Sequence, residues 1–212
     1  MGRKLSESRI DPRPVAIPIA GGELVTGIEW WTADAAILFL HDSHDELGLD
    51  SWGAWPDRFA GLGYAVLVID LPPGHAQEAA RSALEYIAAK GAPRRFVIAA
   101  GDTVGLLDEQ SGDAFVLIAP GPSAIDPGSL GFTPKLIVAG SGDLDAYEPV
   151  EAFARNCRGW SLLSTFAVEN SVPALMNYRH AQQIGSQIAG FLQEYRAPTS
   201  TGISRIGRRT PR

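Results

Sequence analysis

The stretch that decides the fold is Arg95-Phe96-Val97-Ile98-Ala99-Ala100-Gly101-Asp102-Thr103-Val104-Gly105. Its first half is an apolar run that predicts a short buried strand over residues 96–100, and its last five residues have the form G-x-T-x-G. Glycines at this spacing let a strand bend sharply into a helix, so that the middle side chain stands above the sheet. We therefore predict a strand, a tight bend and a helix here, with Thr103 at the apex of the bend.

Strand and helix patterns alternate along the rest of the chain. Apolar runs predict further strands at 15–19, 23–31, 35–40, 64–69, 114–119, 136–139 and 161–168, and amphipathic spacing predicts helices at 52–62, 77–90, 150–158 and 176–195. The segment 106–111 leaves room for a helix of at most about two turns after the bend. This order predicts an α/β fold with a mostly parallel central sheet, an N-terminal antiparallel hairpin, helices on both faces and no cap domain.

The composition is that of one globular domain. The 212 residues are 45% hydrophobic and 20% charged. We expect residues 1–14 to form a flexible leader, residues 15–195 the domain, and residues 196–212 a flexible basic tail. The net charge of −6 argues against a general polyanion binder, and the single cysteine, Cys157, excludes an internal disulfide.

Neither a signal peptide nor a membrane span is visible in the sequence. The first 14 residues carry several charges and lack the apolar core of a signal peptide. No apolar run approaches the roughly 20 residues that a membrane-spanning helix needs. We therefore predict a cytoplasmic protein without a membrane partner.

Four motifs, in this order, resemble those of the α/β-hydrolase superfamily, in particular its small lidless members of the dienelactone-hydrolase type. Leu38-Phe39-Leu40-His41-Asp42 is similar to the strand and His-Gly of the oxyanion loop, and Asp70-Leu71-Pro72-Pro73-Gly74-His75 to the loop after the next strand. Gly101-Asp102-Thr103-Val104-Gly105 looks like the nucleophile elbow, and Gly140-Ser141-Gly142-Asp143 like the turn that carries the acid. The likeness covers residues 15–195.

The resemblance implies a catalytic triad, but two of its positions depart from the family pattern. Thr103 stands at the serine nucleophile, Asp143 at the acid, and Asn170 at the histidine. An amide does not accept a hydroxyl proton near neutral pH, so Asn170 does not replace the general base. In subtilisin, loss of the triad histidine lowers turnover by about a million-fold. We therefore expect a degenerate triad.

The resemblance also implies an oxyanion hole at Ser43 and Val104. A β-branched Thr103 is strained at an apex that usually has positive φ, and Asp42 replaces a glycine beside the hole. Both features argue against a working hole. Residues expected to line the vestigial pocket are His41, Asp42, His44 and Asp102.

Two other chemistries stay open at this stage. A base for Thr103 could come from a histidine elsewhere, namely His41, His44, His75 or His180, each of which also has an ordinary structural role available. The run His41, Asp42, His44 and Asp45 has ligand types that suit zinc or iron. A solvated charged loop accounts equally for that run, and we predict no metal and no cofactor.

These observations favour a pseudo-hydrolase, a catalytically inactive member that binds a protein partner or a small acyl ligand in the vestigial pocket or serves as an assembly subunit. The alternative is a carboxylic ester or thioester hydrolase with Thr103 as an unusual nucleophile. A third hypothesis assigns the function to the tail, whose Arg205, Arg208, Arg209 and Arg212 could contact an acidic partner or RNA. No pattern indicates an oligomeric state.

Overall fold

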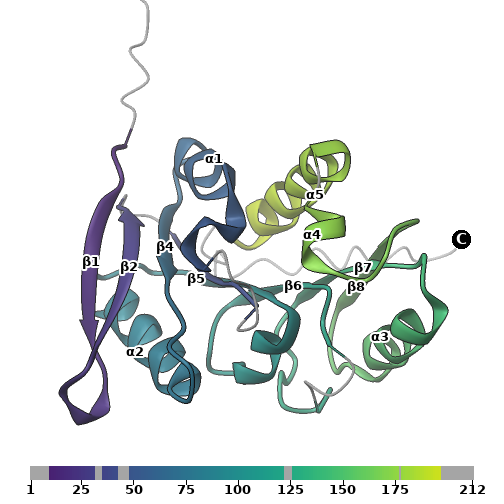
Figure 1. The fold of residues 1–212 in the computed structure, drawn as a ribbon, viewed down its shortest axis with the longest axis horizontal. Coiled ribbons are helices and arrows are strands. Elements are labelled where there is room, and N and C mark those ends of the chain that lie inside the picture. Colours follow the sequence, from purple (N-terminus) through teal and green to yellow (C-terminus); the bar gives the residue numbers. More distant parts are fainter. Residues whose placement is uncertain (1–9, 32–34, 43–47, 122–125, 177, 197–212) are drawn as a thin grey trace, which may run out of the picture.

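A computed structural model describes residues 10–31, 35–42, 48–121, 126–176 and 178–196. These residues form an eight-stranded sheet between two layers of helices (Figure 1). The predicted α/β fold class is confirmed. None of the described helices is both long and apolar enough to cross a membrane.

The strand order in the sheet is β1-β2-β4-β3-β5-β6-β7-β8. Strand β2 pairs antiparallel with β1 and β4, and every other pair in the sheet is parallel. The predicted N-terminal hairpin is therefore confirmed. The strands are β1 (Arg13–Pro18), β2 (Leu24–Trp30), β3 (Ala36–Leu40), β4 (Ala65–Ile69), β5 (Arg95–Ala100), β6 (Ala114–Ile118), β7 (Lys135–Gly140) and β8 (Ser161–Phe166).

The helices cover both faces of the sheet. Helices α1, α4 and α5 pack on one face, and α2 and α3 pack on the other (Figure 1). Their bounds are α1 (Trp55–Gly61), α2 (Ala76–Ala89), α3 (Leu144–Asn156), α4 (Val172–Leu175) and α5 (Tyr178–Arg196), and short 3₁₀ turns are η1 (Ala20–Gly22), η2 (Gly48–Trp52) and η3 (Gly101–Leu106).

Lys135, at the start of β7, is a buried cation among the described residues of the core. Its ammonium group donates hydrogen bonds to the carbonyl oxygens of Gly131, Thr133 and Arg158. Burial lowers the pKa of Lys135, because the charged form loses its hydration. The three carbonyl groups offset part of that cost, so the side chain joins the loop before β7 to the segment before β8.

Both ends of the domain differ slightly from the predicted limits. Strand β1 begins at Arg13, within the segment predicted as a leader, and α5 ends at Arg196, the first residue of the predicted tail. The Arg196 guanidinium donates to the carbonyl oxygens of Leu62 at 2.9 Å and Gly63 at 2.7 Å, and it lies 4.6 Å from the centre of the Tyr64 ring. Residues 1–9 and 197–212 of the two predicted segments lie outside the described residues.

Candidate functional site

The carboxyl ends of β3 and β5 lie side by side in the middle of the sheet. These strands pair in parallel from Ala36 and Arg95 to Leu40 and Ala99. The chain runs from β3 to β4 on one side and then crosses to β5 on the other. Ligands of open α/β sheets bind at such a reversal of strand order, outside the carboxyl ends of the strands. The segments that follow β3 and β5 therefore form the candidate site.

The sharp bend after β5 lies at Gly101. This residue has a φ of +59°, in the left-handed region that favours glycine. Thr103, predicted at the apex, does not adopt a positive φ, because Ala119 is the only non-glycine residue of the described chain that does. The helical residues here form the turn η3, which begins at Gly101, and the helix predicted over 106–111 is not formed. By its backbone conformation, Gly101 is the apex.

The space above Gly101 is filled by the side chain of Asp42. A Cβ atom built on Gly101 would lie 1.8 Å from the Oδ2 atom of Asp42 and 2.4 Å from its carboxyl carbon. No side chain fits at position 101 while Asp42 keeps this position. The Asp42 carboxylate thus occupies the volume into which a nucleophile at the apex would project.

Thr103 is directed into the protein, with 1% of its surface exposed. Its hydroxyl oxygen lies 2.7 Å from the Ala100 carbonyl oxygen and 3.1 Å from that of Leu40, and it accepts a hydrogen bond from the Ala100 amide at 3.2 Å. A hydroxyl has one proton, so the two carbonyl groups share it. The side chain joins the ends of β3 and β5. All three of these hydrogen-bond partners of its hydroxyl are backbone groups.

The other two triad positions bind backbone near their own strands. Asp143 is exposed after β7, and its carboxylate caps α3 by accepting from the Asp145 amide at 3.0 Å. The side-chain oxygen of Asn170 accepts from the Gly140 amide at 3.0 Å and so ties the end of β7 to the segment after β8. Within the described part of the chain, no hydrogen bond joins Thr103 to Asp143 or Asn170.

His41 is buried immediately after β3. Its Nδ1 atom donates to the Asp42 carbonyl oxygen at 2.8 Å. Its Nε2 atom is buried without a hydrogen-bond partner and lies 3.7 Å from Oδ1 of Asp70. Both ring nitrogens are therefore directed at groups other than the Thr103 hydroxyl, and the ring is not placed to take the proton of that hydroxyl.

The remaining histidines lie before α2, on α5 or outside the described residues. His75 precedes α2, with its Nδ1 atom 3.3 Å from Oε2 of Glu78, and the His180 ring on α5 packs edge-on against Phe166. His44 lies in 43–47, which is not described.

The other predicted site residues are scattered. Val104 is buried in the core on the side of α2, and Asp102 is exposed. Ser43 and Asp45, like His44, belong to the segment 43–47 outside the described residues. Across the described ranges, no group of three or more histidine, cysteine or acidic side chains is arranged to hold a metal ion.

Three cavities lie away from these positions. Two of them, of about 350 and 550 Å³, follow α5, and a third of about 320 Å³ lies between α2 and η3. None of the three is lined by Thr103, Asp143 or Asn170.

Sequence reasoning missed the role of Gly101. Its position directly after the predicted strand is a signal for a left-handed bend, because glycine is the residue that adopts positive φ at little cost. Matching Thr103 to the serine of the motif placed the apex two residues further along the chain. The carboxylate of Asp42 above the bend was expected to crowd the site, but its contact with Gly101 depends on the parallel pairing of β3 with β5.

Neither a family model nor a curated protein sequence matches this chain, whereas many solved structures do. A dienelactone hydrolase from Anabaena variabilis has a TM-score of 0.73 at 14% identity, with 88% of this chain and 98% of that one covered. An esterase from Pyrococcus furiosus has a TM-score of 0.70 at 11% identity, with 89% and 92% covered. An esterase from Pyrobaculum calidifontis has a TM-score of 0.66 at 16% identity, with 87% and 86% covered. This chain therefore has the α/β-hydrolase fold. At these identities the likeness shows the fold alone.

Proposed function

We propose that this α/β-hydrolase-fold protein is a pseudo-hydrolase, which acts by binding a protein partner or a small acyl ligand, or as a subunit of an assembly. The observation that carries the proposal is the Asp42 carboxylate above Gly101. Gly101, at the apex of the bend after β5, has no side chain that could attack an ester, and Asp42 leaves no room for one. The chain keeps the architecture of the hydrolase fold, and the Asp42 carboxylate fills the space that a nucleophilic side chain at the bend would occupy.

The surroundings of Thr103 support the same proposal. Nucleophilic catalysis by a hydroxyl requires an accessible oxygen and a base that takes its proton. Thr103 is buried, and the groups that its proton can reach are two backbone carbonyl oxygens. A carbonyl oxygen accepts a hydrogen bond but is far too weak a base to take the proton. The hydroxyl is used to hold two strand ends together.

A fluorophosphonate probe tests the proposal directly. We expect no labelling of Thr103 in the wild-type protein and no hydrolysis of short p-nitrophenyl esters above that of a Thr103→Val variant, which keeps the shape and removes the hydroxyl. The same variant should lose about 1–3 kcal/mol of unfolding free energy, because the Ala100 amide loses its acceptor. A Thr103→Ser variant, which retains the hydroxyl, is the matched control for stability.

Two outcomes would overturn the proposal in favour of an ester or thioester hydrolase with Thr103 as nucleophile. One is labelling at Thr103 that disappears in Thr103→Val. The other is ester hydrolysis by the wild-type protein that the same substitution abolishes. We also expect an Asn170→His variant to stay inactive, since it restores an imidazole but supplies no side chain at the bend.

A further inference from the structure

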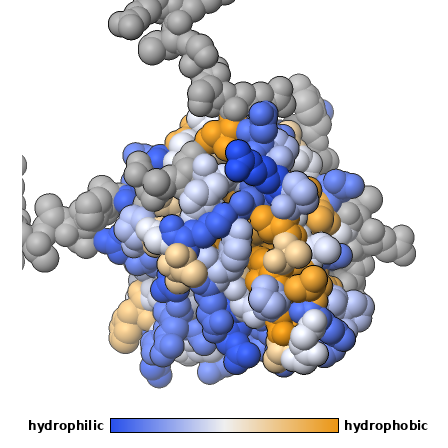
Figure 2. All heavy atoms as spheres, turned by 90° about the vertical axis from the view of Figure 1, so that its left-hand side faces the viewer, coloured by the Kyte–Doolittle hydropathy of each residue, from blue (hydrophilic) through white to orange (hydrophobic). Residues whose placement is uncertain are grey.

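The two edges of the sheet differ in their protection against pairing with another strand. At β1, Pro14 and Pro18 lack amide hydrogens, and both are exposed. Residues two apart in a strand direct their N–H and C=O groups to the same side, so these prolines and Ala16 share a side. Prolines within sheets belong to edges, with the missing N–H facing outward. Figure 2 faces this edge and shows a narrow hydrophobic band among hydrophilic residues.

Strand β8, at the opposite edge, has no such protection in its own sequence or among the residues that the structure describes. Its sequence Ser-Leu-Leu-Ser-Thr-Phe contains neither proline nor a charged residue, so every residue retains its amide hydrogen. Leu162 within the strand is 48% exposed, and Trp160 just before it is 47% exposed. Natural edge strands are normally blunted by charge, proline or a bulge. The edge of β8 therefore retains both the apolar surface and the amides that another strand requires.

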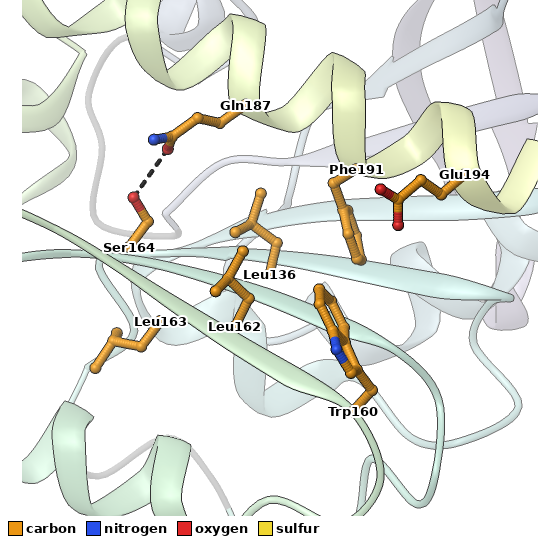
Figure 3. Close-up of a pocket in the computed structure, with 8 residues that line it drawn as sticks. All are labelled: Leu136, Trp160, Leu162, Leu163, Ser164, Gln187, Phe191 and Glu194. Carbon is orange, nitrogen blue, oxygen red and sulfur yellow. Dashed lines mark hydrogen bonds between the residues drawn. The ribbon is translucent and has the colours of Figure 1, made fainter.

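A groove of about 350 Å³ continues this apolar surface between β8 and α5 (Figure 3). The Trp160 ring stacks on Phe191 with the ring centres 5.7 Å apart and the planes 12° apart. Further along, the Ser164 hydroxyl donates to the side-chain oxygen of Gln187 at 2.8 Å. The groove has an apolar end and a polar end, and Glu194 lines it next to the apolar end (Figure 3).

The hollow that follows along α5 gives this surface a charge pattern. It is lined by Gln182, Gln183, Ser186 and Gln187 in the middle of the helix and by Arg179 at its amino end, and the Arg58 guanidinium donates to the Ser186 hydroxyl at 3.0 Å. Arg179 and Glu194 are 15 residues apart, which is about 22 Å along an α-helix. Rotation by 180° about the middle of the helix exchanges the two ends. The pattern is therefore complementary to itself under a two-fold axis.

We propose that the edge of β8 and the adjoining side of α5 form a two-fold interface between two copies of this chain. Strand β8 pairs antiparallel with β8 of the second copy, so that the two sheets become continuous. Trp160 and Leu162 become buried, and Arg179 of each copy lies opposite Glu194 of the other. Such a contact uses the same patch on both subunits and closes with two of them. This inference does not depend on the proposed loss of catalysis.

Sedimentation velocity of the full chain tests the interface. The chain has a mass of 22.6 kDa, so a dimer has twice that mass. Over concentrations of about 1–100 μM we expect the wild-type protein to sediment as a dimer and Leu162→Lys as a monomer, because lysine places charges at the two-fold contact. The matched control is Leu24→Lys, at a residue that is 62% exposed near the other edge, and it should stay dimeric.

Charge reversal supplies a second test that a folding defect does not imitate. Arg179→Glu and Glu194→Arg should each weaken the dimer by about tenfold, because each creates two like-charge pairs across the axis. The double variant Arg179→Glu/Glu194→Arg should regain the wild-type affinity. A wild-type protein that is monomeric at the highest concentration would overturn the proposal. So would a dimer that survives Leu162→Lys, or a double variant that is weaker than either single one.

Discussion

At the residue scale, Asp42 and Gly101 constrain each other. Asp42 follows the buried His41, and its carboxylate lies above the Cα atom of Gly101. Any residue larger than glycine at position 101 would collide with this carboxylate. Gly101 in turn holds a left-handed conformation that a side chain would strain. Placing a serine at position 101 therefore takes at least two simultaneous changes, because its side chain needs the removal of Asp42.

A double-mutant cycle measures this dependence. Gly101→Ser should lower the unfolding free energy by about 2–4 kcal/mol, since serine adopts a strained backbone and displaces Asp42. Asp42→Gly/Gly101→Ser should lose less than the sum of the two single losses, because the collision is gone. Urea denaturation of the four proteins gives the coupling energy. Strictly additive losses would contradict the contact.

The glycine spacing of this segment could be read from the sequence, but the apex of the bend could not. The bend begins where β5 stops, and β5 stops where its pairing ends, at Ala99 with β3 and at Ala100 with β6. That pairing is non-local, whereas a motif is a local pattern. The same reason explains why a degenerate triad could be expected from Asn170, while the carboxylate above Gly101 required the fold.

At the element scale, the strands are predicted best because those buried on both faces are continuous apolar runs. Strands β3, β4 and β6 lie within a residue of their predicted limits. Helix α3 differs most, since it begins at Leu144 and its amphipathic spacing had predicted a start at 150. The missing signal was Asp143, which was interpreted through the family resemblance as an acid and serves as an N-cap.

The role of Asp143 is tested by its effect on α3. Asp143→Ala should lower the unfolding free energy by about 1 kcal/mol, because the Asp145 amide loses its acceptor. Asp143→Asn should retain most of the stability, since asparagine is an equally good N-cap. Thermal unfolding followed by circular dichroism compares the variants. Equal melting temperatures for Asp143→Ala and the wild-type protein would argue against the capping role.

At the scale of the whole molecule, the order of elements was enough to predict the sheet, because crossover connections between parallel strands follow few topologies. Contacts between distant elements were not predictable in the same way. The buried carboxylate of Glu29 on β2 accepts from the hydroxyl of Tyr86 at 3.0 Å and pairs with the ammonium of Lys90, just after α2. The same ammonium lies 4.4 Å from the centre of the Trp31 ring.

The Glu29–Lys90 pair makes stability depend on alkaline pH. Burial lowers the pKa of Lys90, but the Glu29 carboxylate and Tyr86 more than offset this, and the net pKa is raised above the usual 10.5. Because the pKa of Lys90 is higher in the folded state, the ion pair contributes its full stabilisation below pH 10.5, the ordinary pKa of lysine. This contribution to the unfolding free energy is lost as pH rises through the pKa of Lys90 in the folded protein. Glu29→Gln should therefore be less stable than the wild-type protein at neutral pH.

The comparison of the two proteins across pH is the measurement. The difference in unfolding free energy from urea denaturation should stay constant from about pH 7 to about pH 10 and should narrow as pH rises above 10.5. A difference that stays constant above pH 10.5 as well would show that Glu29 does not raise the pKa of Lys90. Lys4→Gln, at a lysine outside the described residues, serves as a control for the general effect of losing a titrating group.

The hydrogen bonds from Arg196 to the carbonyl groups of Leu62 and Gly63 join the end of α5 to the segment between α1 and β4, which matters for folding during synthesis. The ribosome makes α1 and β4 long before α5, whose Ile188, Phe191 and Leu192 share one core with Phe59 and Tyr64. Until α5 has emerged from the ribosomal exit tunnel, the hydrophobic residues of α1 and β4 that it covers stay exposed in the nascent chain. Exposed hydrophobic surface of this kind is recognised by chaperones. We therefore expect this half of the domain to complete its core only after α5 has left the exit tunnel.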